Sequence, residues 1–282
     1  ASPLGIMLAS AVNYQLAGVW LADQPHLSWR YVFAFGLAPV AVALLVRFCL
    51  RESERWERRR SAQRPRLADL FAPALRPATV AALLVSLSGL LTWWAINAFV
   101  PLLGAGLAAE HGAASGVVPA AQVVESWKSA ASNAFNLGGL LGCLLAIPLA
   151  ERLGRRRMFL AYFGAAALAI FAAFGLPLAA PQRIAMLFVV GVPVYGVFGT
   201  FVFYLPELFP TRLRALGAGF AYNIGRVLAA AGPFAVGAIA APAGGDSAVI
   251  VQKLFWVGCA PLLAALLARR WVLETRGRSL PD

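Results

Sequence analysis

The sequence contains few side chains that could make or break covalent bonds. Its two histidines, His26 and His111, lie far apart, and a metal site would need further ligands beside them. The three cysteines, Cys49, Cys143 and Cys259, fall in or at the end of apolar stretches and have no CxxC spacing, which favours buried thiols over redox chemistry. We therefore expect no metal site and no catalytic residue.

A second set of polar residues interrupts long apolar stretches, and these side chains are suited to binding. Arg226 stands out among them, because no acidic residue that could pair with it lies well inside any of the apolar stretches. The others are amides and aromatic residues with a polar atom, namely Asn13, Gln15, Trp93, Trp94, Asn97, Asn133, Asn136, Tyr195, Tyr222 and Asn223. What they do depends on the elements that carry them.

The composition is that of a membrane protein. The chain has 282 residues, of which 61% are hydrophobic and 13% are charged, and its mean hydropathy is +0.75. Soluble domains are about half apolar and about a quarter charged, and a chain of this length could not bury the excess apolar surface. A soluble enzyme, a disordered tail and a soluble nucleic-acid-binding domain are excluded.

The sequence predicts an all-α polytopic membrane protein with eight transmembrane helices. A transmembrane helix needs about 20 mostly apolar residues, and such stretches occur at 3–21, 29–50, 77–100, 129–150, 158–180, 184–204, 215–240 and 248–268. They are too long for the alternating strands of about ten residues in a membrane barrel. Gly138, Gly139 and Gly142 follow no predicted strand, so they favour close helix packing over a nucleotide-binding loop, and we expect no cofactor.

The basic residues alternate between the two sides of the predicted spans. Most of the 24 lysines and arginines lie in the connectors 51–76, 151–157 and 205–214 and in the tail 269–282. Because cytoplasmic loops are enriched in Arg and Lys, we expect a multi-pass plasma (inner) membrane protein in which both ends of this chain face the cytoplasm. The net charge of +12 is dispersed over four loops, which argues against nucleic acid as a partner.

Burial in a membrane makes the polar residues costly unless they find a partner. Arg226 sits about ten residues into its span, on the order of 15 Å deep at about 1.5 Å per residue, and an Arg at mid-membrane costs roughly 2.5–3.5 kcal/mol. An anionic substrate, an acid outside this chain or backbone carbonyl groups could each compensate. For Asn133 and Asn136, which share a helix face, a substrate path and an interhelical hydrogen bond both stay open. Trp93 and Trp94 could stack on a substrate or pack against lipid.

Two clusters of charged residues mark predicted helix ends. The first is the turn Glu151-Arg152-Leu153-Gly154-Arg155-Arg156-Arg157, where Gly permits a tight turn and the arginines meet anionic headgroups and helix-end carbonyls. The second runs from Glu207 through Pro210-Thr211 to Arg214, followed by Gly217 and Gly219. Glu207 and Arg214 are placed to form charge-assisted bonds across neighbouring helix ends.

Together these motifs resemble the major facilitator superfamily. Its Gly-x-x-x-Asp-Arg-x-Gly-Arg-Arg turn is matched by Glu151, Arg152, Gly154, Arg155 and Arg156, with Glu151 in place of Asp and Ile147 in place of the first Gly. The stretch from Glu207 to Gly219 is similar to the Glu-x-x-Pro-Thr-x-x-Arg-x-x-Gly segment of its sugar-porter-like and metabolite:proton symporter branches. Residues 52–56, Glu-Ser-Glu-Arg-Trp, are similar to the Pro-Glu-Ser-Pro-Arg-Trp segment of the same branches, with Arg51 and Glu54 at the proline positions.

The resemblance implies that the chain forms helices five to twelve of a twelve-helix fold. Residues 1–50 then form the last two helices of the N-terminal half, 51–76 the basic central cytoplasmic loop, 77–268 the C-terminal six-helix half and 269–282 a cytoplasmic tail. Four N-terminal helices of the same protein are expected to precede them. The start at Ala1-Ser2-Pro3, without an initiating Met, fits a chain that begins within a longer protein.

The resemblance implies a secondary transporter that moves a small polar metabolite, such as an organic anion or a sugar, by alternating access. The two charged clusters would form its cytoplasmic gate, and the interior polar residues would line the substrate path. A co-transported proton needs a titratable group in that path, and we expect this group outside the chain. The alternatives are a non-transporting sensor or assembly subunit on the same fold and, less favoured, a polytopic membrane enzyme, for which no cluster of catalytic side chains is present.

Overall fold

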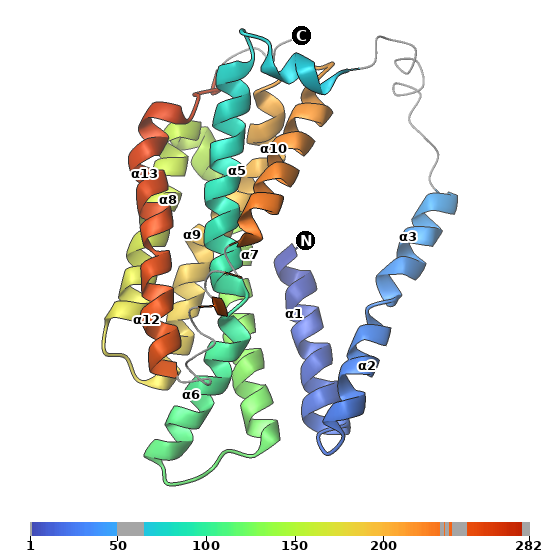
Figure 1. Cartoon of the computed structure of the whole chain (residues 1–282), viewed down its shortest axis with the longest axis vertical. Helices are drawn as coiled ribbons and strands as arrows, with labels where there is room; N and C mark the ends of the chain where they lie inside the picture. The colour runs from blue at the N-terminus through green and yellow to red at the C-terminus, as the bar shows by residue number, and fades with distance from the viewer. Residues whose placement is uncertain (1, 50–64, 232–233, 235–236, 239–246, 278–282) are drawn as a thin grey trace.

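The computed structural model describes residues 2–49, 65–231, 234, 237–238 and 247–277, and every regular element within them is a helix. Figure 1 shows α5 to α13 gathered in one bundle, with α1 beside it and α2 and α3 leading away. The helices are α1 (Ser2–Asn13), η1 (Tyr14–Trp20), α2 (Pro25–Phe35), α3 (Ala38–Cys49), η2 (Leu67–Phe71), α5 (Arg76–Asn97), α6 (Val100–Ala114), α7 (Ala121–Leu153), α8 (Arg155–Gly175), α9 (Ala180–Glu207), α10 (Arg214–Ala229), α12 (Ser247–Val257) and α13 (Cys259–Trp271).

The predicted all-helical membrane fold is confirmed. Within the described residues, six helical stretches are long and apolar enough to cross a membrane: Pro25–Cys49, Arg76–Ala114, Ala121–Leu153, Arg155–Gly175, Ala180–Glu207 and Ser247–Trp271. The two other predicted spans correspond to α1 with η1, and to α10, which is described as far as Ala229. The predicted central-loop motif at 52–56 lies outside the described residues.

Two predicted span boundaries were wrong. The predicted outer connector after residue 100 contains α6, which places His111 in the last turn of a helix. The span predicted from 129 to 150 belongs to α7, which begins at Ala121 and has 33 residues. At about 1.5 Å per residue, such a helix is longer than the hydrocarbon core is thick. Glu125 and Lys128 therefore lie in a helix and not in a loop.

Helices α7 and α9 approach so closely that their backbones touch. A Cβ atom on Gly138, Gly142 or Gly191 would overlap a backbone carbonyl oxygen of the other helix. Small residues permit this approach because they bring no side chain into the contact. Helices α5, α6, α8 and α10 each contact α9, so the tight α7–α9 pair lies among them.

Replacement of Gly142 by Ala is expected to destabilise the protein. The new methyl group would meet the carbonyl oxygen of Val192, and overpacking of this kind costs about 1–3 kcal/mol. The melting temperature in detergent measures the effect. Gly164→Ala is the matched control, because nothing lies within 4 Å of a Cβ atom at Gly164. Equal melting temperatures for the two variants would contradict the backbone contact.

Helix α1 packs on the first part of α7 through polar contacts. The Ser10 hydroxyl donates to the Ser129 hydroxyl over 3.2 Å, and Asn13 Nδ2 donates to Glu125 Oε2 over 3.1 Å. Glu125 also pairs with Lys128 at 2.6 Å. Glu125, which lies outside the predicted span of 129–150, thus lies at the junction between α1 and α7.

Candidate functional site

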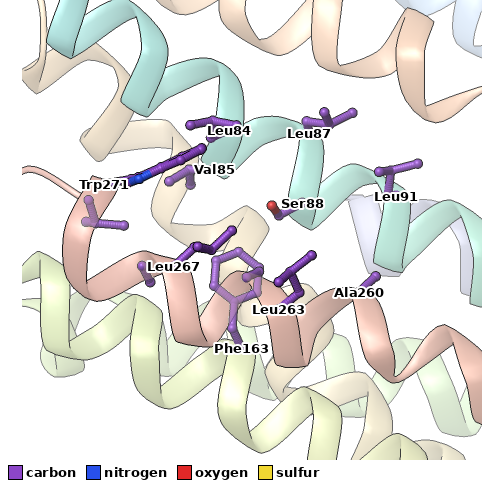
Figure 2. A pocket seen from close by; sticks show the side chains of 13 residues that line it. Leu84, Val85, Leu87, Ser88, Leu91, Phe163, Ala260, Leu263, Leu267 and Trp271 are labelled. Atoms are coloured by element: carbon purple, nitrogen blue, oxygen red, sulfur yellow. The ribbon is translucent and has the colours of Figure 1, made fainter.

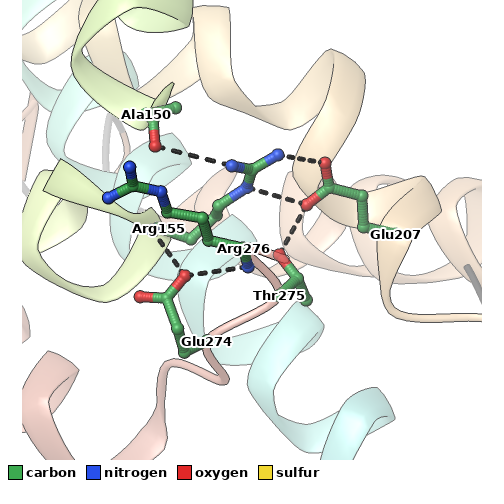
Figure 3. Close-up of polar contacts among 6 residues, drawn as sticks. All are labelled: Ala150, Arg155, Glu207, Glu274, Thr275 and Arg276. Atoms are coloured by element: carbon green, nitrogen blue, oxygen red, sulfur yellow. Dashed lines mark hydrogen bonds and ion pairs between the residues drawn. The ribbon is translucent and has the colours of Figure 1, made fainter. Parts of the chain in front are cut away.

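A charged cluster joins the turn between α7 and α8 to the end of α9. Arg155 donates from Nε and Nη2 to the two carboxylate oxygens of Glu207, over 3.0 Å and 2.5 Å. Its Nη1 donates to the carbonyl of Ala150 over 3.4 Å (Figure 3). Arg155 and Glu207 are each only 16% exposed, so this is a bidentate, partly desolvated ion pair.

The segment that follows α13 completes this cluster. Thr275 donates its hydroxyl to Glu207, and Glu274 accepts hydrogen bonds from the backbone N–H groups of Arg155 and Arg156 over 2.9 Å and 3.1 Å. Figure 3 shows that the side chains of this cluster come from three separate parts of the chain: Arg155, Glu207, and the pair Glu274 and Thr275. We call Arg155, Glu207, Glu274 and Thr275 the gate cluster, because the sequence analysis predicts that Arg155 and Glu207 belong to a cytoplasmic gate.

Glu274 acts as a cap for α8. The first N–H groups of a helix have no partner within the helix and carry partial positive charge, and the Glu274 carboxylate satisfies two of them. Gly154 makes this possible, since its φ of 80° turns the chain between α7 and α8 and a Cβ atom there would lie 2.8 Å from Glu274 Oε2. Burial opposes ionisation of Glu274, but hydrogen bonds from three backbone N–H groups lower its pKa overall.

Glu274→Gln is expected to weaken this cap and lower the melting temperature, by a stability loss of about 1 kcal/mol. Because the folded-state pKa of Glu274 is depressed, its stabilisation is complete above the ordinary value of 4.5 and is lost as the pH falls through the folded-state pKa. Melting curves at neutral and acidic pH measure both effects. Glu151→Gln is the control, because Glu151 is exposed. A variant that melts like the wild type at neutral pH would contradict the cap.

The other residues of the predicted gate have different surroundings. Arg156 Nε donates to the carbonyl of Val272 over 2.9 Å, and the carbonyl of Arg152 accepts from Arg276. Glu151 accepts no hydrogen bond among the described residues. Arg214 does not reach Glu207 there, and its Nε and Nη2 atoms are buried without a partner. The structure therefore brings Arg155 and Glu207 together and leaves Glu151 and Arg214 outside the pair.

A second candidate site is a cavity of about 960 Å³ between α5, α7, α9 and α10. This volume is at the upper end of the range for small-molecule sites. Seven of its 19 lining residues are aromatic, and the start of α1 forms part of the wall. The polar and aromatic side chains in this wall are Ser2, Trp93, Trp94, Cys143, Tyr195, Phe198, Phe201, Phe203, Tyr222 and Arg226. We call it the central cavity.

The rings of the central cavity form a continuous series. Trp93 contacts Trp94, Tyr195 and Phe198, with ring centroids 5.0, 5.8 and 5.6 Å apart. Phe198 contacts Phe201, which in turn contacts Tyr222. Such a wall presents π faces and edges to a ligand and binds flat apolar groups.

Arg226 is the cationic residue of this cavity wall. Its guanidinium carbon lies 5.8 Å from the centroid of the Tyr222 ring, and the side chain is exposed. Within the described residues it forms no ion pair and no hydrogen bond to a carbonyl group. Of the three partners that the sequence allows for Arg226, an anionic substrate and an acidic residue elsewhere in the whole protein remain.

The other predicted path residues divide between the cavities and helix contacts. Asn223 lines a second cavity of about 540 Å³, which shares Trp94 and Arg226 with the central cavity. Asn136 instead accepts a hydrogen bond from the Tyr195 hydroxyl over 2.5 Å and thereby links α7 to α9. Asn133 donates to Ser129, and Asn13 binds Glu125. Asn97 and Gln15 line neither cavity.

Comparison with known proteins identifies the family. The model of the family described as "Major Facilitator Superfamily" matches residues 1–233. The chain belongs to the major facilitator superfamily. It is a multi-pass membrane protein with six described helical stretches that are long and apolar enough to cross a membrane.

Three known proteins that are similar to the chain each match it over about half of their own length. The chain is 30% identical to the "Cis,cis-muconate transport protein" of Acinetobacter baylyi over 80% of its own length and 52% of the relative's. It is 28% identical to the "Probable 4-methylmuconolactone transporter" of Cupriavidus pinatubonensis, over 83% and 52%. It is 27% identical to the "Synaptic vesicle 2-related protein" of Rattus norvegicus, over 92% and 52%. The chain thus spans about half the length of these relatives.

Proposed function

We propose that the whole protein to which this chain belongs is a secondary transporter for small organic anions with a flat, unsaturated or ring-containing body. The observation that carries the proposal is Arg226, an exposed cation without an ion-pair partner among the described residues, in the wall of an aromatic cavity. A carboxylate would neutralise its charge, and the rings would contact the body of the anion. Two relatives bear the names of transporters for muconate and a muconolactone.

The proposal includes the position of the protein in the membrane. The protein lies in the plasma (inner) membrane, both ends of this chain face the cytoplasm, and four further helices precede it in the whole protein. The arginine-rich connectors support this orientation. The two halves rock around the central cavity, and the gate cluster closes the cytoplasmic side in one of the two states.

The driving force is a separate part of the proposal. No Asp, Glu or His side chain lines either of the two cavities described above. If uptake is coupled to protons, we expect the coupling acid in the N-terminal helices that precede this chain. Among the acids of the described helices, Glu125 is the second candidate for the coupling acid, because it lies at the contact between α1 and α7.

Uptake of labelled cis,cis-muconate into proteoliposomes that contain the full-length protein tests the function. We expect saturable uptake, which benzoate and other flat carboxylates inhibit and which glucose does not. An imposed proton gradient, dissipated by an ionophore in the control, measures coupling. Binding without uptake in either direction would instead support the sensor alternative, and glucose uptake without muconate uptake would refute the proposed substrate class.

A further inference from the structure

An apolar groove lies between α5 and α13 on the outside of the bundle. It has a volume of about 300 Å³, and its walls include Leu84, Leu87 and Leu91 from α5 and Leu263, Leu267 and Trp271 from α13 (Figure 2). In Figure 1, α13 lies at the left edge of the bundle and α2 and α3 lie at its right. The groove shares no residue with the central cavity, so the transported substrate does not account for it.

The size and chemistry of the groove match a hydrocarbon chain. Ser88 is the single polar side chain among the lining residues, and Leu263 is 58% exposed. A helix with its side chains is about 10–12 Å wide, which is too wide to enter a hollow of about 300 Å³. An acyl chain is narrower and would cover the leucine side chains with methylene groups.

Positive charge lies at one end of this groove. Arg269 and Arg270 occupy the last turn of α13, are exposed, and form no ion pair or hydrogen bond within the described residues. Arg270 follows Leu267 by three residues and Leu263 by seven, which places it on nearly the same face of the helix. Trp271 closes the same end of the groove, and Trp is enriched where membrane meets water.

We propose that this groove binds an anionic phospholipid, with one acyl chain between α5 and α13 and the phosphate held by Arg270. Basic residues at the ends of transmembrane helices attract anionic headgroups. The bound lipid would also hold the end of α13 in place. There the carbonyl of Val272, another wall residue, accepts a hydrogen bond from Arg156, and the chain continues to Glu274 and Thr275 of the gate cluster.

Native mass spectrometry of the full-length protein tests this site. The protein is delipidated in detergent and titrated with dioleoyl phosphatidylglycerol or, as the zwitterionic comparison, dioleoyl phosphatidylcholine. We expect one phosphatidylglycerol to bind preferentially. Arg270→Ala should weaken its binding about fivefold. Arg157→Ala is the matched control, because Arg157 is exposed at the start of α8 and has no ion pair or hydrogen bond within the described residues.

Two further variants test the groove itself. Leu267→Trp and Leu91→Trp each fill it, from α13 and from α5, so a folding defect in one does not hide the result. Both should displace phosphatidylglycerol while the arginines remain. Equal binding of the two lipids, an equal loss in Arg157→Ala, or undiminished binding in a folded groove-filling variant would overturn the proposal. So would a dimer that retains no phospholipid and whose contact includes Leu263.

Discussion

Replacement of Arg226 by Ala is expected to remove anion transport while leaving the protein folded. A hydrogen bond to a charged group is worth about 1.5–3 kcal/mol, so we expect affinity for muconate to fall by about tenfold or more. The fold should tolerate the change because Arg226 has no ion pair or hydrogen bond within the described residues, and its contact there is with the Tyr222 ring. Binding isotherms and initial uptake rates measure the effect.

Two controls make the Arg226 result specific. Arg226→Lys keeps the charge but loses the planar fork that binds a carboxylate in bidentate fashion, so it should retain part of the affinity. Ile224→Ala, on the same helix, removes an exposed side chain that lines neither cavity, and its effect should be much smaller. If Arg226→Ala lowers the melting temperature as strongly as it lowers binding, a structural role for Arg226 replaces the substrate contact.

Breaking the pair between Arg155 and Glu207 is expected to slow transport without removing substrate binding. Each single Ala variant leaves a partly buried charge without its partner, and the proposed gate would lose its bidentate contact. We expect initial uptake rates to fall about tenfold, which corresponds to about 1.4 kcal/mol. The dissociation constant for muconate should change little, since neither residue lines the central cavity.

A double-mutant cycle separates the pair from its surroundings. The double variant Arg155→Ala/Glu207→Ala should lose little more than either single variant, because the two residues act as one unit. Glu151→Ala serves as the control, an exposed acid of the same turn. Equal loss of substrate binding in Arg155→Ala and Glu207→Ala would refute the gate assignment.

The sequence was sufficient for the membrane fold because lipid imposes simple rules. A helix must present about 20 apolar residues to cross the membrane, and this pattern located the long helices of the described residues but not α6. It could not locate their ends where a helix continues into water. Helix α7 begins at Ala121, and nothing in its hydropathy separates its first eight residues from a polar connector.

The candidate site was predictable only in part. Arg155 and Glu207 were found because charged residues at predicted helix ends stand out, but their mutual contact spans 52 residues of sequence. Glu274 and Thr275 were assigned to a tail, since the helix they stabilise is far away in the chain. The one signal was a carboxylate six residues after the last predicted span, which ends at residue 268. The role of Asn136 was open because an amide can face a cavity or, as found, a tyrosine on α9.

The cap on α8 has a consequence for how the protein is made. Glu274 reaches the N–H of Arg155 across 119 residues of chain, so the ribosome completes α8, α9, α10 and α13 before the residue that caps α8 exists. During synthesis the first turn of α8 carries uncapped N–H groups, and Glu207 lacks the hydrogen bond from the Thr275 hydroxyl. The gate cluster is therefore complete only after the segment beyond α13 has been made. A nascent chain that stalls before Val272 would carry its helices but would lack the cap on α8 and the hydrogen bond from Thr275 to Glu207.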